Sequence, residues 1–394
     1  MDYSVDMRDL GKKSSIIREI FEYGKARKQE IGADRVFDFS IGNPSIPAPE
    51  KVEKILNELL KENPVKLHGY TAAAGDPIVR ARIADLLNRD YEAGAIADYI
   101  YMTCGAAASL TISLTAILKK GEEVLVPSPY FPEYKVFTER AGGKLVPVPC
   151  GTDFQLDLAA IKSSINESTR AIIINSPNNP TGAVFSEETL RELSAILTAF
   201  ERKWNKTIYL IADEPYRKLI WSDQKPAFLP RLYADTLVCY SYSKVLSLPG
   251  ERIGYIYVSP LMRNSSDVYA AICGAGRALG YVCAPSMMQY LVAECGDETA
   301  DLSVYRENRD LLMRELSRIG YDFVSPDGAF YLFMRALEPD AYAFMERAKR
   351  YELLLVPSDD FGCPGYVRIA YCVTPYQIKQ SIPAFEALYR YYKG

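Results

Sequence analysis

The chain contains a single histidine, His68, and this limits the chemistry that its side chains can perform. Imidazole is the commonest metal ligand and the usual base beside a serine or cysteine nucleophile. One histidine excludes a metal site built on two histidines and leaves one candidate imidazole base, for which we expect a structural role. We expect no metal site, and we expect any reaction to run mainly on other groups.

Polar and small residues follow the apolar runs of the chain. AIIIN runs into SPNNPTG (171–182), TIYLIAD into EPY (207–216), and TLVCYSYS into KVLSLPGERIG (236–254). A loop that enters a helix adds small residues at 105–109, which let an anion approach backbone N–H groups at the helix N-terminus. Because ligands bind at the carboxyl ends of parallel strands, these segments predict one site for a small anionic ligand.

Arg368 stands between Val367 and Ile369 in an apolar run. A guanidinium in such a run needs an anionic partner, because an unpaired buried charge is costly. A structural ion pair and an anionic ligand would each supply that partner.

The chain from about residue 102 to residue 259 supplies the elements that position these residues. Runs rich in β-branched and aromatic residues, typical of buried strands, occur at 122–127, 171–177, 207–213, 236–243 and 252–259. Helical stretches separate them, such as 186–204, which opens with Ser186 and has acidic residues in its first turn. Strands that alternate with helices predict an α/β fold with a mostly parallel sheet flanked by helices.

The pattern changes after about residue 280, where a charged helical stretch at 303–319 leads into a smaller α+β layer. The segment IGNPSIPAP (41–49) is a loop-like break, so the residues before it are expected to pack with that layer. We therefore expect a large domain of residues 46–279 and a small domain made of residues 1–45 and 280–394.

The bulk composition narrows the class of protein. With 46 basic and 50 acidic side chains the net charge is −4, which argues against nucleic-acid and anionic-membrane partners. No run approaches the roughly 18 apolar residues of a membrane helix, and the N-terminal segment has no apolar signal core. The eight cysteines form no CxxC pair. We expect reduced thiols in a cytoplasmic enzyme.

Two segments look like nucleotide-binding motifs. GAGRALG (274–280) has its last glycine one residue late for a dinucleotide fingerprint, and no strand clearly precedes it. IYLIADE (208–214) resembles a metal-binding strand of nucleotide hydrolases, but the chain contains no GxxxxGK[ST]. Both nucleotide interpretations are therefore disfavoured.

Five segments together carry a resemblance to a known family. SYSKVLSLPGERIGY (241–255) resembles the lysine motif of the class I/II aminotransferases, which are pyridoxal-phosphate enzymes of fold type I. NNPTG (178–182), DEPY (213–216) and YVRIAYC (366–372) occur in that family's order, and 69–87 resembles its early segment. The resemblance covers nearly the whole chain. It implies a large domain with a mostly parallel sheet, a smaller α+β domain, and an aspartate aminotransferase-like enzyme.

The resemblance implies catalytic roles for Lys244, Asp213 and Tyr216. Lys244 would form the internal aldimine with pyridoxal 5′-phosphate and move a proton between the substrate Cα and the cofactor C4′. An amine does this only when partly deprotonated, which desolvation and nearby cations promote. Asp213 would pair with the protonated pyridine nitrogen, which keeps the ring an electron sink. Tyr216 and Asn179 resemble the pair that hydrogen-bonds the 3′-oxygen of the ring.

The other cofactor contacts are also implied by the resemblance. The phosphate would be bound by two hydroxyls, one guanidinium and a run of backbone N–H groups, which belong to Ser241, Ser243, Arg252, Gly105, Ala106 and Ala107. The two alanines depart from some relatives, because they offer no hydroxyl. Tyr130 resembles the aromatic residue that stacks on the pyridine ring, with a core position as the alternative. Tyr70 matches a residue that reaches the phosphate of the neighbouring subunit, which implies a homodimer with shared active sites.

Arg368 resembles the arginine that clamps the substrate α-carboxylate, and Asn179 and Gly42 are expected in the same pocket. Aspartate aminotransferases need a second cation for the distal carboxylate. One bacterial subgroup has a lysine where this chain has Ala107, and another uses an arginine of the partner subunit. Arg277 lies 33 residues after the lysine of the motif, close to the place of that arginine. These positions favour dicarboxylic substrates such as aspartate and 2-oxoglutarate, with a solvated Arg277 as the alternative.

The resemblance as a whole implies a transaminase that moves an amino group from an L-amino acid to a 2-oxo acid by ping-pong turnover. One alternative is β-elimination by a C–S lyase, which would release pyruvate and ammonia without an oxo-acid substrate. A second is a regulatory protein that keeps the fold without turnover. Lys244 and Asp213 argue against the regulator.

Overall fold

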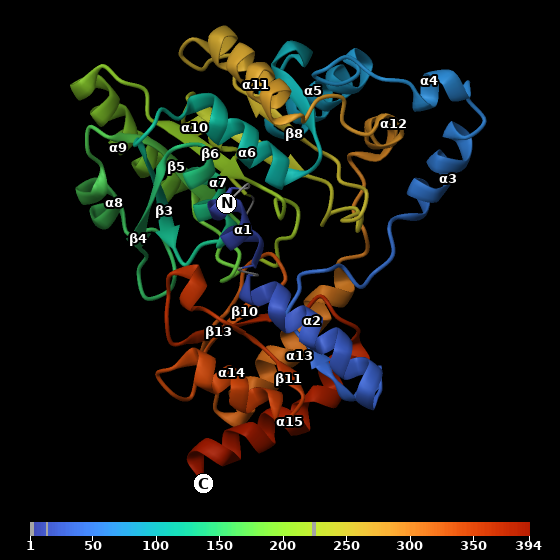
Figure 1. Ribbon diagram of the computed structural model, residues 1–394, viewed down its shortest axis with the longest axis vertical. Coiled ribbons are helices and arrows are strands. Elements are labelled where there is room, and N and C mark those ends of the chain that lie inside the picture. The colour runs from blue at the N-terminus through green and yellow to red at the C-terminus, as the bar shows by residue number, and fades with distance from the viewer. Residues whose placement is uncertain (1–3, 13–14, 223–225) are drawn as a thin grey trace.

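A sheet of seven strands positions the strand-end residues singled out above (Figure 1). The structure, a computed structural model, describes residues 4–12, 15–222 and 226–394. The strand order is β2-β8-β7-β6-β5-β3-β4. The bounds are β2 (Ile100–Thr103), β3 (Glu123–Ser128), β4 (Lys144–Pro149), β5 (Thr169–Asn175), β6 (Tyr209–Asp213), β7 (Thr236–Ser241) and β8 (Gly254–Val258). Neighbours are parallel except at β8, which is antiparallel to both β2 and β7. The predicted α/β fold with a mostly parallel sheet is confirmed.

Helices cover both faces of this sheet. Successive side chains of each strand point to opposite faces, and apolar side chains on both faces are buried under helices. In β6, Ile211 packs in one apolar cluster, while Leu210 and Ala212 pack in another. The first cluster includes residues of α6 (Ala106–Ile117), α7 (Glu133–Arg140) and α11 (Ser265–Leu279). The second includes residues of α5 (Pro77–Tyr91), α8 (Leu158–Ser164), α9 (Glu187–Trp204), α10 (Leu229–Leu232) and α12 (Ser286–Cys295).

The start of α9 follows the residues that predicted it. The Ser186 side chain accepts a hydrogen bond from the backbone N–H of Thr189, and two glutamates stand in the first turn. The helix ends at Trp204 and is capped by Asn205, whose backbone is left-handed (φ 48°). Its buried residues, such as Leu190 and Leu197, form one stripe against the sheet.

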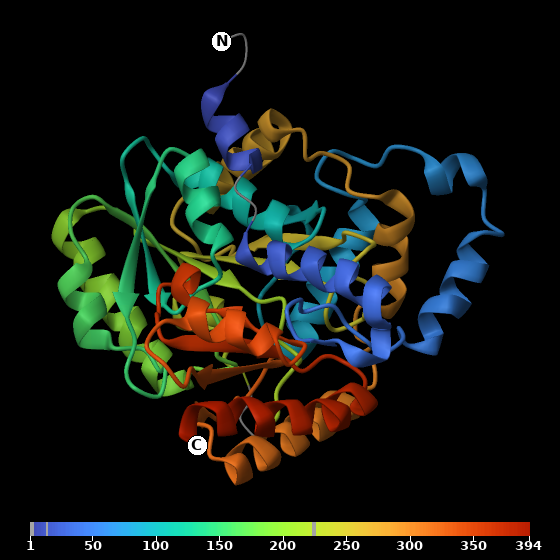
Figure 2. The same ribbon diagram turned by 60° about the horizontal axis from the view of Figure 1, so that its bottom comes forward.

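The C-terminal part of the chain forms a smaller layer with the N-terminal segment, as Figure 2 shows. Its four-stranded antiparallel sheet has the order β12-β13-β10-β9, and β1 pairs in parallel with β11. The strands are β1 (Phe37–Asp38), β9 (Phe323–Val324), β10 (Tyr331–Arg335), β11 (Leu353–Leu354), β12 (Val356–Pro357) and β13 (Tyr366–Ala370). The helices of this layer are α2 (Ile16–Ile31), α13 (Ser303–Ile319), α14 (Ala341–Lys349) and α15 (Pro375–Lys393), whereas α1 (Val5–Lys12) has no buried residue and lies apart from the layer in Figure 2.

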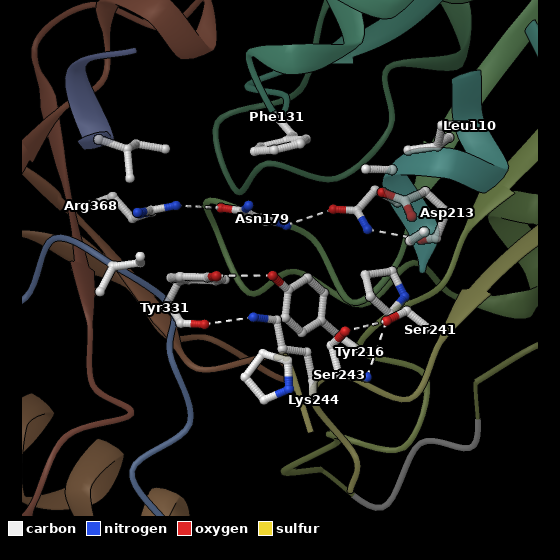
Figure 3. Close-up of a pocket in the computed structure, with 18 of the residues that line it drawn as sticks. Leu110, Phe131, Asn179, Asp213, Tyr216, Ser241, Ser243, Lys244, Tyr331 and Arg368 are labelled. Atoms are coloured by element: carbon white, nitrogen blue, oxygen red, sulfur yellow. Dashed lines mark hydrogen bonds between the residues drawn. The ribbon is translucent and has the colours of Figure 1, made fainter. Parts of the chain in front are cut away.

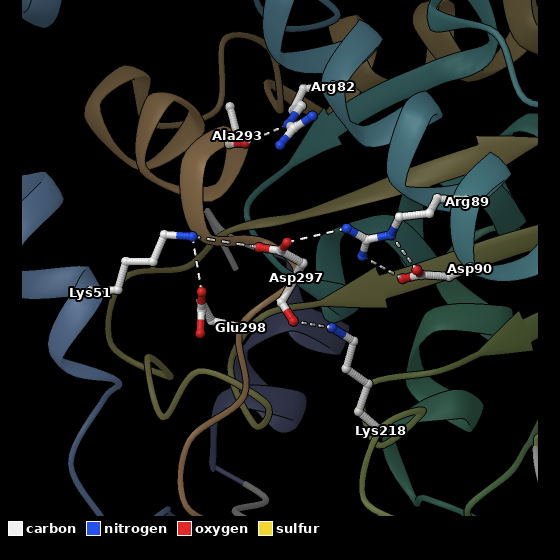
Figure 4. Close-up of polar contacts among 8 residues, drawn as sticks. All are labelled: Lys51, Arg82, Arg89, Asp90, Lys218, Ala293, Asp297 and Glu298. Atoms are coloured by element: carbon white, nitrogen blue, oxygen red, sulfur yellow. Dashed lines mark hydrogen bonds and ion pairs between the residues drawn. The ribbon is translucent and has the colours of Figure 1, made fainter.

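Two connections join the layers in the described part of the chain, and a network of ion pairs holds the second one in place (Figure 4). The first leads into α3 (Glu50–Leu59), which is followed by α4 (Pro64–His68), and the second follows α12. Lys51 Nζ lies 2.9 Å from Glu298 Oε1 and 3.9 Å from Asp297 Oδ1. Arg89 contacts the other oxygen of Asp297 at 3.3 Å, and Lys218 donates to the Asp297 backbone carbonyl at 2.9 Å. This network holds the second connection against the large sheet and its helices.

Helix α12 lies against α3 and α5, on the side of the large sheet. Its residues, 286–295, therefore pack apart from the smaller layer to which the sequence pattern assigned them. Among residues 4–12, 15–222 and 226–394, no helix combines the length and apolar character that crossing a bilayer requires. All eight cysteines lie in the described part of the chain and are free.

Candidate active site

A cavity of about 270 Å³ lies where the carboxyl ends of β5, β6 and β7 meet the smaller layer (Figure 3). The N-terminus of α6 closes one side of it. Eleven predicted site residues line it, namely Gly42, Ala106, Ala107, Asn179, Asp213, Tyr216, Ser241, Ser243, Lys244, Arg252 and Arg368. Parallel strands place their carboxyl ends at one edge, which explains why residues so far apart in the chain meet here.

Lys244 lies in the turn that follows β7, and its amine points into the cavity. Its Nζ donates to the Gly42 carbonyl at 2.6 Å and lies 5.6 Å from the ring centroid of Phe330. Burial lowers the pKa of this amine to about 8, and the nearby guanidinium groups of Arg252 and Arg368 act in the same direction. Near neutral pH a useful fraction of the amine is therefore an unprotonated nucleophile and base.

Asp213 is the last residue of β6 and is buried. Its Oδ2 accepts a hydrogen bond from the Tyr134 hydroxyl at 2.5 Å, while its Oδ1 is buried without a partner in the described part of the chain. Burial raises the pKa of Asp213 to about 7, the Tyr134 hydrogen bond opposes that rise, and the neighbouring Glu214 adds to it. A free carboxylate oxygen at a cavity wall fits a protonated ring nitrogen.

Two asparagines connect Asp213 to Arg368. Asn175, at the end of β5, donates to the Asp213 backbone carbonyl at 2.9 Å and accepts from the Asn179 backbone N–H at 2.7 Å. Asn179 Oδ1 accepts from Arg368 Nη1 at 3.0 Å. Across the cavity, the hydroxyls of Tyr216 and Tyr331 lie 2.9 Å apart. The strand ends and the smaller layer thus share one polar network.

The end of the cavity near α6 has the groups that a phosphate needs. Ser241 Oγ donates to Ser243 Oγ at 2.7 Å, and Arg252 Nη1 lies 3.4 Å from the same Ser243 oxygen. Gly105 precedes α6 with φ 87°, and a Cβ there would lie 2.8 Å from Arg252 Nη2. Only glycine fits this backbone and this approach. The first-turn N–H groups of a 12-residue helix, two hydroxyls and a guanidinium form an anion site.

Arg368 is 2% exposed in the middle of β13. Besides Asn179, its guanidinium donates to the Ser40 carbonyl at 2.5 Å and lies over the ring of Tyr331 at 4.6 Å. No carboxylate of the described residues forms an ion pair with it, and its Nε has no partner there. Burial lowers the pKa of Arg368. The alternative, a structural ion pair, is not found in residues 4–12, 15–222 and 226–394, so the buried cation is open to an anionic ligand.

Tyr130 does not line the cavity, and its neighbour Phe131 does. The Tyr130 backbone N–H donates to the Phe361 carbonyl at 3.0 Å, and a Cβ on Gly362 would lie 2.8 Å from the Tyr130 ring. This packing turns Tyr130 toward the segment before β13 and leaves the following aromatic ring to face the cavity. Two adjacent aromatic residues offered no sequence signal to distinguish them.

Three further residues lie on the surface of the chain. Tyr70 is 99% exposed beyond α4, and His68, at the end of α4, is exposed. Arg277 is exposed in the last turn of α11. None of them lines the cavity of this chain. The segment 274–280, with its nucleotide-like glycines, lies in and just after α11.

Several cavity residues were missed by the sequence analysis. Asn175 ends the strand run AIIIN, so the strand-end rule that selected Asp213 would also have found it. Ile17, Ile41, Leu110, Phe131 and Tyr331 also line the cavity. Apolar residues on a helix or in a loop give no signal of a site, because the same residues fill the core.

Comparisons with known proteins show which family the chain resembles. The family model of "Aminotransferase class I and II" matches residues 34–385. The probable aspartate aminotransferase of Methanocaldococcus jannaschii is 30% identical over 386 residues, which cover 96% of this chain and 97% of that protein. The probable aspartate/prephenate aminotransferase of Aquifex aeolicus is 31% identical, with 91% of this chain and 92% of that protein covered.

Solved structures give the same result. An amino transferase from Eubacterium rectale is 51% identical, with a TM-score of 0.97 and full coverage of both chains. The aspartate aminotransferase of Thermus thermophilus with maleate is 26% identical, with a TM-score of 0.87 over 98% of this chain and 100% of that one. The expected fold type I architecture is confirmed.

Proposed function

Because the chain belongs to the class I and II aminotransferase family, and is therefore a pyridoxal-phosphate-dependent aminotransferase, we propose the following site for its reaction. The enzyme moves an amino group between an L-amino acid and a 2-oxo acid, with Lys244 as the catalytic amine. One observation carries this proposal. A partly deprotonated lysine and a buried arginine without an ion pair in the described residues line the same cavity.

The residues present fit the cofactor. Ser241, Ser243, Arg252 and the N-terminus of α6 would hold the phosphate, and the unpaired Asp213 Oδ1 would take the ring N–H. Bound in this way, pyridoxal 5′-phosphate supplies an electron sink for the bond broken at the substrate Cα. Tyr216 and Asn179 are the candidates for the 3′-oxygen, and Phe131 replaces Tyr130 as the candidate for the face of the ring.

The chain's own residues would position the substrate and move its proton. The planar guanidinium of Arg368 binds the α-carboxylate through two parallel hydrogen bonds, and Asn179 fixes the plane of that guanidinium. Lys244, held by the Gly42 carbonyl, would take the proton from the substrate Cα and deliver it to C4′ of the cofactor. Gly42 has no room for a side chain, since a Cβ would lie 2.1 Å from the Tyr331 hydroxyl oxygen.

A stoichiometric half-reaction tests this function. Holoenzyme mixed with one amino acid and no oxo acid should release one equivalent of the matching 2-oxo acid per site and then stop. A second 2-oxo acid added later should take up the amino group and be released as the corresponding amino acid. Continuous release of pyruvate and ammonia from a cysteine conjugate would instead identify a C–S lyase. Absence of product with a broad amino-acid panel would contradict the proposal.

We also propose dicarboxylic substrates, such as aspartate and 2-oxoglutarate, on the strength of the relatives' names. The cations that line the cavity in the described part of the chain are Lys244, Arg252 and Arg368. A distal carboxylate would therefore need a cation from a second subunit, and exposed Arg277 is the candidate. Arg277→Ala should lower kcat/KM for aspartate at least about tenfold and leave alanine unaffected. Equal loss for both substrates would refute the assignment.

A homodimer with shared active sites is the assembly we propose. Support comes from Tyr70, which is 99% exposed in one chain and so is available for contact with a neighbouring subunit. Mixing Tyr70→Phe with Lys244→Ala subunits tests this, because each hybrid dimer would keep one site with both native residues. No recovery of activity on mixing would contradict it. The eight free cysteines support a reducing compartment, and we propose the cytoplasm.

A further inference from the structure

We infer that Tyr134 is a positioning residue that keeps Asp213 ionised by donating its hydroxyl to the carboxylate, so that the ring nitrogen of the cofactor keeps its proton. The inference rests on the proposed function, since it assigns Asp213 to that nitrogen. Tyr134 itself does not line the cavity. Its effect on the reaction would therefore pass through Asp213.

The two carboxylate oxygens of Asp213 have separate environments. Oδ1 has no partner in the described residues, whereas Oδ2 accepts the Tyr134 hydroxyl at 2.5 Å. No other side chain of residues 4–12, 15–222 and 226–394 donates to this carboxylate. With one oxygen reserved for a ligand, the Tyr134 hydroxyl is the side-chain hydrogen-bond donor that the described residues offer to the charged form of Asp213.

The surroundings of Asp213 otherwise favour its neutral form. Burial is the main effect, and Glu214, the next residue, adds a second negative charge. Glu214 is itself paired with Arg217, which limits its influence. Tyr216 and Cys239 also face this region, and burial raises the pKa of each, so both remain neutral. A hydrogen bond to the charged form is therefore needed to keep Asp213 ionised near neutral pH.

Tyr134 is suited to act as a permanent donor. Burial and the Asp213 charge hold its pKa well above the usual value for tyrosine, so the hydroxyl keeps its proton. The ring is 1% exposed in α7 and packs edge-on against Phe131, with centroids 5.6 Å apart. The same short segment thus supplies a cavity wall through Phe131 and the support of Asp213 through Tyr134.

The test measures Asp213 directly in the cofactor-free chain. The carboxyl carbon of ¹³C-labelled Asp213, assigned by the loss of its NMR signal in Asp213→Asn, is titrated in wild type and in Tyr134→Phe. Loss of a hydrogen bond to a charged group changes a protonation equilibrium about tenfold or more. The titration midpoint of Asp213 should therefore be at least about one pH unit higher in Tyr134→Phe than in wild type. Tyr233→Phe is the matched control, because it removes a buried hydroxyl that bonds to the Ile208 carbonyl at 2.6 Å instead.

A fluorinated tyrosine at position 134 provides the second variant, since it keeps the shape and donates more strongly. It should lower the midpoint of Asp213, and it carries the test if Tyr134→Phe does not fold. In the holoenzyme, a ¹⁵N-labelled cofactor should lose its ring proton at a lower pH in Tyr134→Phe than in wild type.

Wild-type midpoints in both Tyr134 variants would overturn the inference. The cofactor-free titration does not involve Lys244 or turnover. Failure of the proposed function would therefore leave its result unchanged, and the two failures are distinguishable.

Discussion

Replacement of Lys244 with methionine is expected to raise the free energy of unfolding of the cofactor-free chain near neutral pH. The amine lies in a cavity where burial lowers its pKa from 10.5 to about 8. When the pKa of a base is lower in the folded state, the protein loses stability as the pH falls from the unfolded pKa to the folded one, because folding must then expel a proton or bury a charge. Methionine has a similar length and no charge, so it removes this cost.

The size of the effect follows from the two pKa values. Linkage with 10.5 unfolded and about 8 folded gives a cost of about 3 kcal/mol at pH 6.5 and about 1.5 kcal/mol at pH 9.5. Lys244 is only partly buried, so solvent in the cavity screens the charge and these values are upper bounds. Lys244→Met also loses the hydrogen bond to the Gly42 carbonyl, which reduces its gain in stability by about 1 kcal/mol at every pH. The difference between the two pH values, at most about 2 kcal/mol, is free of that offset.

Urea unfolding of both cofactor-free proteins between pH 6.5 and 9.5 measures this difference. The advantage of Lys244→Met should shrink steadily as the pH rises. Lys162→Met, at an exposed position of α8, is the control for the change of residue type. An advantage that stays constant across the pH range would refute the reasoning, because it would show that the amine is not desolvated in the folded chain.

Three further outcomes are expected. Arg368→Gln should raise KM for the amino acid about 10- to 100-fold in steady-state assays, because a buried charged fork to the α-carboxylate is lost; an unchanged KM would contradict this. Gly42→Ala should lower stability by about 1–3 kcal/mol in urea unfolding, since its Cβ would lie 2.1 Å from the Tyr331 hydroxyl; wild-type stability would show that Tyr331 has room to move. Asp297→Asn should cost about 1 kcal/mol at low salt and less at high salt, as its pairs with Lys51 and Arg89 are partly exposed; a cost independent of salt would argue against ion pairing.

The sheet was predictable from the sequence because its strands are buried on both faces. Runs such as TIYLIAD are continuous in apolar residues, and the polar residue that ends each run marks the carboxyl edge of the sheet. Lys244, Asp213 and Asn179 meet there, as predicted from their positions after strands. Arg368 joins them from the other layer. Only the order of motifs along the chain, and not local pattern, pointed to that long-range contact.

The remaining site residues depend on contacts that no local pattern encodes. Which of Tyr130 and Phe131 faces the cavity is decided by the segment around Phe361, more than 200 residues later in the chain. Tyr134 reaches Asp213 from a helix on one face of the sheet. Its sequence neighbourhood is that of an ordinary core tyrosine, which gives no indication of its partner.

Peptide mapping of the holoenzyme after borohydride reduction tests the central claim most directly. Reduction converts the linkage between the cofactor and its lysine into a stable one that mass spectrometry can locate. We predict a single cofactor-sized mass increase on the peptide that contains Lys244, and none in Lys244→Ala. A modification at another lysine, or an unmodified wild-type protein after incubation with pyridoxal phosphate, would contradict the assignment of Lys244.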